Sequence, residues 1–302
     1  MIHEYAVEPA CLGDWQTFRY LLAQFGVSQG RVISRFPKNW KKDVHQLVNS
    51  SDSFRNKEIL IENAFNKIPR VLVRSGRPYD DARDWLDNAL LQQETKPFYA
   101  IIAKEARTKE KNILVADEIG QGTPQWAIPR ERKVLRTMDA LGEAVAPFLR
   151  ISHKILFVDK FFHPAFDRWR ELLERFIKIA GEEKDRLPQF EYHCGIDSKG
   201  PETVGFHENC RRYLPQILPK GASIQINCWG PKRSGGDFFH ARYILADKGG
   251  MRIDWGLDHA DGTSKTTDVS LLDDSLWEEE WNRLTATPSY YDKLDSFIIR
   301  ND

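Results

Sequence analysis

His240 and Arg242 stand two residues apart in a segment whose apolar residues, between 238 and 246, are typical of a β-strand. Side chains two positions apart on a strand share a face, so we expect both to point into one pocket. The imidazole of histidine, with an unperturbed pKa of about 6.5, can give or take a proton near neutral pH. A neighbouring cation such as Arg242 favours its neutral form. The pair therefore predicts acid–base or nucleophilic chemistry beside a fixed positive charge.

Asp247 follows His240 by seven residues and falls on the opposite face of the predicted strand. It begins the turn Asp247-Lys-Gly-Gly250, a position where aspartate commonly bonds its own backbone. Taken from the residues alone, this placement favours an architectural role for Asp247.

The three residues have the spacing H-x-K-x4-D of the phospholipase D superfamily, with arginine in place of the usual lysine. Gly256, after the next predicted strand, stands where that family has a G-S-x-N element. The segment is more similar still to the phospholipase-D-like domain at the C-terminus of MIT-domain proteins, which has a similar His-x-Arg-Tyr strand followed by Gly-Leu-Asp. The resemblance covers about residues 140–275 and does not reach the first 130 residues.

The resemblance implies a metal-independent and cofactor-independent phosphodiesterase. In that family one histidine attacks phosphorus, a second protonates the leaving oxygen, and lysines hold the nonbridging oxygens. On this template His240 is the nucleophile or general acid, Arg242 binds phosphate, and Asp247 completes the catalytic motif. A guanidinium–phosphate contact is charge-assisted and bidentate, although its planar fork does not occupy the position of an ammonium.

The family's active site needs two copies of the motif, whereas none of the other seven histidines is followed by a basic residue at the second position. The second histidine is therefore supplied by another subunit, as in a homodimer, or is absent. Three readings remain open: a nuclease or related phosphodiesterase, an inert module binding nucleic-acid or phosphoinositide phosphate, and a scaffold subunit of a larger complex. Prokaryotic members of the superfamily often serve in antiphage defence, which the resemblance permits.

Further residues are candidates for substrate binding. Asp159 ends a predicted strand, where α/β sheets place their ligands. His259 takes the position of the family's asparagine. The segment between residues 31 and 42 is the most basic of the chain, and its interleaved Phe36 and Trp40 suit a surface that tracks phosphates and stacks bases. Its candidate cations are Arg31, Arg35, Lys38, Lys41 and Lys42.

The order of elements predicts an α/β (α+β) protein of two domains. Residues 1–133 form a mildly basic, mainly helical domain of unknown family, with a strand over residues 70–74 and a hairpin formed by residues 98–103 and 113–116. Residues 134–302 alternate helices and strands, which predicts a mixed sheet flanked by helices. Glycine, proline and charge concentrate between residues 118 and 133, where we place the boundary.

Composition narrows the class of protein. Lys and Arg number 44 and Asp and Glu number 44, which excludes a wholesale polyanion binder and makes any nucleic-acid surface local. The four cysteines are too widely spaced for a C-x-x-C metal or redox motif, so buried thiols are predicted and no metal. No apolar run is long enough to span a membrane and no signal peptide is recognised, so a cytoplasmic protein is expected.

Overall fold

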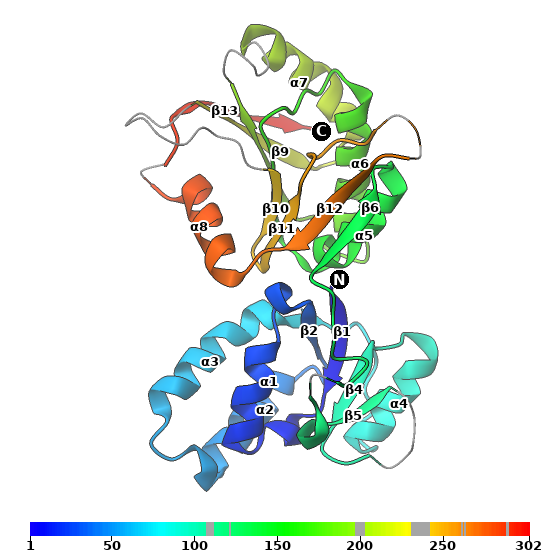
Figure 1. Cartoon of the computed structure of the whole chain (residues 1–302), viewed down its shortest axis with the longest axis vertical. Coiled ribbons are helices and arrows are strands. Elements are labelled where there is room, and N and C mark those ends of the chain that lie inside the picture. The colour runs from blue at the N-terminus through cyan, green and yellow to red at the C-terminus, as the bar shows by residue number, and fades with distance from the viewer. Residues whose placement is uncertain are drawn as a thin grey trace. The chain divides into compact units, whose positions relative to one another are not determined.

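The computed structural model describes residues 1–106, 112–120, 122–196, 203–230, 242–260, 262, 264–287 and 290–302. The chain divides into two compact units, Met1–Arg130 and Glu131–Asp302. Each unit combines a β-sheet with helices (Figure 1), so the predicted α/β class is confirmed. Within the described residues, no helix is long and apolar enough to cross a membrane.

The first unit is built on a parallel sheet of five strands in the order β3-β2-β1-β4-β5. This is the strand order of a doubly wound fold, in which the chain reverses direction across the sheet beside β1. The strands are β1 (His3–Val7), β2 (Arg31–Arg35), β3 (Leu72–Arg74), β4 (Ala100–Ala103) and β5 (Ile113–Val115).

Four α-helices flank this sheet, with short 3-10 turns between elements. The helices are α1 (Trp15–Gln24), α2 (Trp40–Ser50), α3 (Glu58–Val71) and α4 (Trp85–Thr95). Alternate residues of β1 face different cores: Tyr5 and Val7 pack in a cluster with residues of α1, α2 and α3, whereas Ala6 packs with residues of α4. The sheet therefore has helices on both faces.

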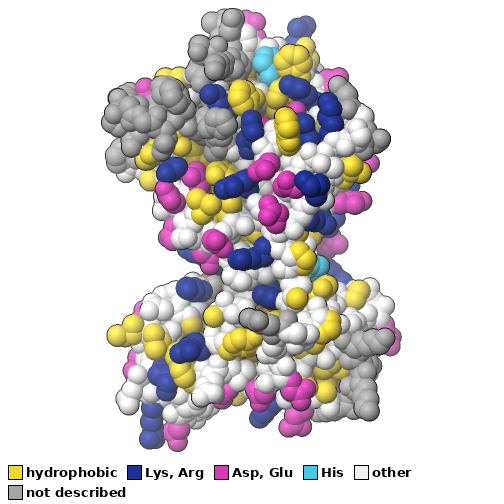
Figure 2. Space-filling view, viewed as in Figure 1, with side chains coloured by type: hydrophobic (Ala, Val, Ile, Leu, Met, Phe, Trp, Pro, Cys, Tyr) yellow, Lys and Arg dark blue, Asp and Glu magenta, His cyan; other side chains and the backbone are white. Residues whose placement is uncertain are grey.

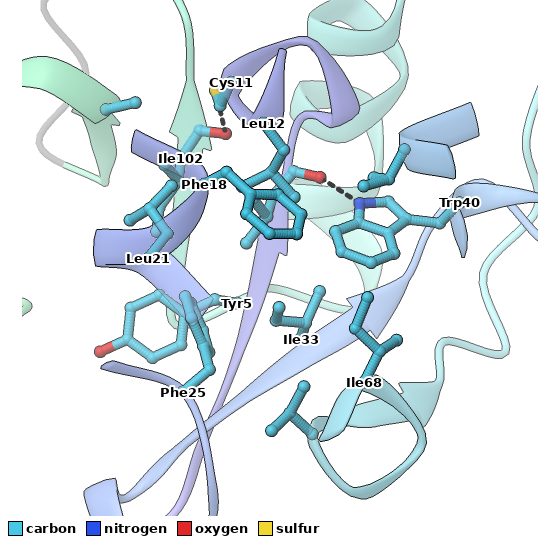
Figure 3. Packing of buried hydrophobic residues seen from close by; sticks show 14 of the residues in the cluster. Tyr5, Cys11, Leu12, Phe18, Leu21, Phe25, Ile33, Trp40, Ile68 and Ile102 are labelled. Atoms are coloured by element: carbon cyan, nitrogen blue, oxygen red, sulfur yellow. Dashed lines mark hydrogen bonds between the residues drawn. The ribbon is translucent and has the colours of Figure 1, made fainter. Parts of the chain in front are cut away.

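The larger of these cores lies between β1, β2 and helices α1 to α3 (Figure 3). Its polar atoms are satisfied internally: the Trp40 indole donates to the carbonyl of Val7 at 2.6 Å, and the Cys11 thiol donates to the carbonyl of Ile102 at 3.8 Å. Cys11 is a buried free thiol, as predicted for the cysteines.

The structure corrects three sequence predictions in this unit. Strands β4 and β5 do not form a hairpin but pair in parallel, with Ile101 opposite Ile113. The uniformly buried residues of β4 are typical of a parallel strand covered on both faces. The unit is also less exclusively helical than predicted, because β1 and β2 were not recognised. Arg70 belongs to α3, not to the predicted strand of residues 70–74.

The second unit contains an eight-stranded mixed sheet in the order β13-β9-β8-β7-β10-β11-β12-β6. Strands β7, β8 and β9 are parallel, and the other pairings are antiparallel. The strands are β6 (Glu131–Leu135), β7 (Lys154–Asp159), β8 (Gln189–Gly195), β9 (Ser223–Trp229), β10 (Arg242–Ala246), β11 (Gly249–Ile253), β12 (Thr266–Leu271) and β13 (Lys293–Arg300).

Helices cover the two faces of this sheet unequally. They are α5 (Met138–Ile151), α6 (Asp167–Gly181), α7 (Thr203–Ile217) and α8 (Asp274–Thr285). Phe157 of β7 stacks on Phe176 of α6, with ring centroids 6.0 Å apart, whereas its neighbours Leu156 and Val158 pack in a cluster with Trp277 of α8. Because side chains alternate along a strand, Asp159 shares the α6 face with Phe157.

Candidate functional site

The pairing of strands β7 and β10 brings two of the predicted site residues, Asp159 and Arg242, together. In their antiparallel register, Asp159 at the end of β7 is directly opposite Arg242 at the start of β10. Residues opposite one another in a pair point to the same face of the sheet, so both side chains share the α6 face. His240 lies outside the described residues, so its predicted position beside Arg242 stays a prediction.

The carboxylate of Asp159 is buried, with 2% of the residue exposed. Its Oδ1 accepts a hydrogen bond from the backbone N–H of Phe161 at 2.9 Å, and its Oδ2 accepts one from Leu257 at 2.7 Å. Burial raises the pKa of Asp159, and this outweighs the opposing effects of the two hydrogen bonds and of the Arg242 charge. Asp159 therefore carries its charge less readily than an exposed aspartate. Its hydrogen bond from Leu257 also holds the loop after β11 against the end of β7.

Gly256 makes room for this carboxylate. A Cβ atom at position 256 would lie 2.7 Å from Oδ2 of Asp159 and 3.4 Å from Oδ1 of Asp258, and the backbone has φ of +123°. Only glycine adopts that conformation without strain while allowing so close an approach. The glycine that carried part of the family resemblance thus serves here to bring two buried carboxylates together.

Asp258 holds two arginines from distant parts of the chain. Its Oδ1 accepts from Nη2 of Arg136 at 2.9 Å, and its Oδ2 is 3.6 Å from Nε of Arg168. Arg136 is largely buried, whereas the side chain of Arg168 is about half exposed, at 51%. We refer to Arg136, Asp159, Arg168, Arg242 and Asp258 as the arginine–aspartate cluster.

Arg242 is oriented by one strong contact and left open at another. Its Nη1 donates to the carbonyl of Asp254 at 2.7 Å, and its guanidinium lies 5.4 Å from the ring centroid of Phe161. Among the described residues, its buried Nε has no hydrogen-bond partner, and neither has the buried Nε of Arg136. An unsatisfied buried donor costs about 1–3 kcal/mol, so each Nε is a position where an acceptor is expected.

The charge of the cluster favours an anion. It contains three arginines and two aspartates, and the raised pKa of Asp159 shifts the balance further towards positive charge. Among the described residues, no group of three or more His, Cys, Asp or Glu side chains is arranged to hold a metal ion. The arrangement can bind a group with several oxygen acceptors, of which phosphate suits the planar guanidinium best.

The other residues predicted in this unit lie apart from Arg242 or are already paired. Asp247 follows the far end of β10, where its Oδ1 accepts from the backbone N–H of His153 at 2.8 Å. It is five positions beyond Arg242 along the strand direction, a distance of about 16 Å. Nε2 of His259 lies 2.9 Å from Oε2 of Glu171 on α6, beside the cluster.

The basic segment of the first unit is not the predicted stacking surface. Arg31 is 7% exposed, and its Nη1 donates to the carbonyl of Gln24 at 3.1 Å. Phe36 and Trp40, proposed to stack bases, are buried in the two cores of the unit. The remaining four cations are exposed: Arg35, Lys38, Lys41 and Lys42.

Sequence reasoning missed Arg136 and Arg168 as site residues. Arg136 is 122 positions from its partner Asp258, and neither arginine lies in a recognisable motif. Asp258 was visible as the last residue of Gly-Leu-Asp, but no role was assigned to it. The sequence indicated only that a buried aspartate would need a cationic partner, and spacing along the chain does not show which arginine that partner is.

A second buried polar network lies on the face of the sheet that α8 covers. Nδ1 of His193 accepts from the indole N–H of Trp229 at 3.0 Å, so the proton of the neutral ring resides on Nε2, 3.1 Å from Oε2 of Glu191. Burial lowers the pKa of His193. Burial tends to raise the pKa of Glu191, but hydrogen bonds from His193 and Lys154 outweigh it and lower that pKa to about 2. His193 is thus a satisfied core residue.

Comparison with known proteins identifies no family for the chain. No family model matches it, and no curated protein matches it. Among solved structures, it is similar to TrmBL2, described as an archaeal chromatin protein that shows a novel mode of DNA binding. That similarity has 10% sequence identity and a TM-score of 0.31, and it covers 59% of this chain and 59% of TrmBL2. Similarity at this level does not establish a shared fold.

Proposed function

We propose that the second unit binds the phosphoryl group of a phosphodiester at the arginine–aspartate cluster and cleaves it without a metal, as a nuclease. The observation that carries the proposal is the buried Nε of Arg242, which has no partner in the described part of the chain, beside the buried carboxylate of Asp159. With Nη1 held by the carbonyl of Asp254, the remaining edge of the guanidinium, Nε and Nη2, can hold two phosphoryl oxygens in a bidentate contact.

In this proposal His240 performs the chemistry. It is two residues from Arg242 in sequence, and on the phospholipase D template its neutral imidazole attacks phosphorus and forms a phosphohistidine while the leaving oxygen takes a proton. That proton comes from a second histidine, which a second copy of the chain supplies in a homodimer. Water then attacks the phosphohistidine and gives a proton back to the second histidine, so that the P–N bond breaks, the phosphate product leaves and both imidazoles return to their starting state. Asp159 and Asp258 act as positioning residues, because their oxygens are occupied by backbone N–H groups and arginines.

The test is cleavage in the presence of EDTA. Labelled single-stranded and double-stranded DNA and RNA are incubated with the full chain and with three variants. We expect His240→Ala to abolish cleavage while binding persists, and Arg242→Ala to weaken both. Arg242→Lys should keep the charge but lose the Nε contact, and so retain part of the binding. Cleavage by His240→Ala at the full rate would refute the assignment.

The rival function is phosphate binding without cleavage. It is favoured by one observation: Oε2 of Glu171 already lies 2.9 Å from Nε2 of His259, the residue at the position of the family's asparagine. An inert module should show no cleavage of any substrate, with salt-sensitive binding that Arg242→Ala removes and His240→Ala leaves intact. A scaffold subunit should be indifferent to both variants and should copurify with a partner protein.

A further inference from the structure

Two exposed aromatic rings flank the arginine–aspartate cluster. Trp255, in the turn after β11, is 63% exposed, and Phe166, at the start of α6, is 55% exposed. The guanidinium of Arg136 lies 5.1 Å from the ring centroid of Trp255, and that of Arg168 lies 6.0 Å from the ring centroid of Phe166. A single exposed aromatic ring is ordinary on a protein surface, but each of these two lies beside an arginine that Asp258 holds in place.

Asp258 fixes this arrangement. The same carboxylate holds Arg136 at 2.9 Å and Arg168 at 3.6 Å, so each ring lies beside a cation whose position is already set. Rings placed in this way lose little further freedom when a ligand binds. The carboxylate of Asp258 therefore positions both the positive charges and the cations that the two rings contact.

The sequence predicted a surface of cations and stacking rings around Phe36 and Trp40, but both of those rings are buried. The described residues show the mixture at Trp255 and Phe166 instead. Figure 2 shows positive and negative side chains interleaved over the displayed surface of each unit, without a large patch of one sign. A polyanion would therefore be recognised by a local site, not by the overall charge of the protein.

We propose that Trp255 and Phe166 stack the bases of a single-stranded nucleic acid whose phosphates contact Arg168, the half-exposed arginine of the cluster. This inference rests on the proposed function and names its substrate class. Base–aromatic stacking needs bases with open faces, which single strands offer and duplexes keep stacked on one another. A membrane surface fits less well, because it requires a contiguous apolar patch, whereas charged arginine side chains stand beside both rings.

The experiment measures the affinity of the full chain for a labelled single strand and for the matching duplex, by fluorescence anisotropy. All proteins carry His240→Ala so that no strand is cut. We expect Trp255→Ala to weaken single-strand binding about 5- to 100-fold with little effect on duplex binding, and Trp255→Phe to restore most of it. Phe166→Ala should act in the same direction. Arg168→Ala should reduce the salt dependence of binding, which Trp255→Ala should leave unchanged.

Tyr20→Ala is the matched control, because Tyr20 is an exposed aromatic residue of the first unit. Its affinity should equal that of the parent protein, and thermal unfolding should show that Trp255→Ala is folded. Single-strand affinity unchanged by both Trp255→Ala and Phe166→Ala would overturn the inference. So would binding to vesicles of anionic phospholipid that Trp255→Ala abolishes, with no effect on nucleic acid.

Failure of this inference and failure of the proposed function give different results. If Arg242→Ala still removes cleavage and binding while Trp255→Ala changes nothing, the phosphoryl site stands and the stacking platform is refuted. If Trp255→Ala weakens single-strand binding but no substrate is ever cleaved, the platform stands and the protein is a binding module. Absence of any nucleic-acid binding refutes both.

Discussion

At the scale of single residues, the candidate site depends on atoms that lie closer together than chain spacing suggests. Gly256 has no side chain to separate Asp159 from Asp258, and Asp159 in turn ties the loop after β11 to the end of β7. Because residue 256 has no Cβ atom, the carboxylates of Asp159 and Asp258 can both approach the turn after β11.

Replacing Gly256 by alanine should therefore damage both fold and site. The Cβ atom would meet Oδ2 of Asp159 at 2.7 Å in a backbone with φ of +123°, and we expect a loss of about 2–4 kcal/mol of unfolding free energy and of phosphate binding. Chemical denaturation and binding measurements check this. Gly221→Ala is the control, because Gly221 also has a positive φ, of +75°, but nothing within 4 Å of its Cβ position. Equal losses in the two variants would contradict the role given to the close approach.

His193 should make stability depend on pH. Burial lowers its pKa from 6.5 in the folded protein, so below pH 6.5 the unfolded chain binds more protons than the folded one. The free energy of unfolding should then fall as the pH drops from 6.5. The contribution of Glu191, whose pKa falls from 4.5 to about 2, should be lost in turn as the pH drops below 4.5.

Denaturation between pH 7 and pH 5 tests this, because only histidine titrates strongly in that window. His193→Gln should flatten the profile there, whereas Glu191→Gln should act mainly below pH 5. A variant without His193 that keeps the full slope would show that another group controls it.

At the scale of elements, strand β10 has a site residue at one end and is followed by a structural residue at the other. Its first residue, Arg242, faces the cluster, and the residue after its end, Asp247, binds the backbone of His153 and Lys154 at the start of β7. Arg242 and Asp247 are therefore separated by the length of β10. The sequence motif placed them together because it reads spacing along the chain and not direction in space.

Asp247→Ala should consequently destabilise the second unit without removing the chemistry. Leaving the two N–H groups of residues 153 and 154 without their acceptor should cost about 1–2 kcal/mol. Substrate affinity and cleavage per folded molecule should stay within about twofold, as judged from active-site titration and unfolding curves. A loss of catalysis comparable to that of Arg242→Ala, in a protein that remains folded, would restore Asp247 to the catalytic motif.

At the scale of the whole molecule, each unit has its own sheet and its own cores. The residues of the arginine–aspartate cluster all belong to the second unit, between residues 136 and 258. All five members of the cluster therefore come from one compact unit.

A fragment of residues 131–302 should therefore fold and bind phosphodiesters with the affinity of the full chain to within a few fold. Circular dichroism and anisotropy measure this. If the fragment is folded but does not bind, the first unit contributes to recognition, and its four exposed cations at positions 35, 38, 41 and 42 become the candidates.

The salt dependence of binding should be shallow. The chain has no excess of basic residues, and the cluster offers three arginines with Lys160 nearby in sequence. With a slope of about −0.7 per contacted phosphate for single strands, log K against log salt should fall with a slope no steeper than about −3. A much steeper slope, measured by titration at several salt concentrations, would indicate a phosphate track larger than this cluster.

The sequence by itself determined the α/β class and most elements of the second unit. The helical spacing of α5 and α6 and the apolar runs of β7, β8 and β9 are local patterns, set by which face of each element is buried. It also singled out Arg242, Asp159 and Gly256, because a strand end, a same-face pair and a glycine turn are visible in a short window.

Only the tertiary structure decided what those residues do together. Arg136, Arg168 and Asp258 meet because β6, α6 and the turn after β11 converge in space, and no local pattern encodes a contact across 122 residues. The same is true of the parallel pairing of β4 with β5 and of the burial of Phe36 and Trp40. Short-range physics fixes which face of an element is apolar, but which element covers that face is set by packing of the whole unit.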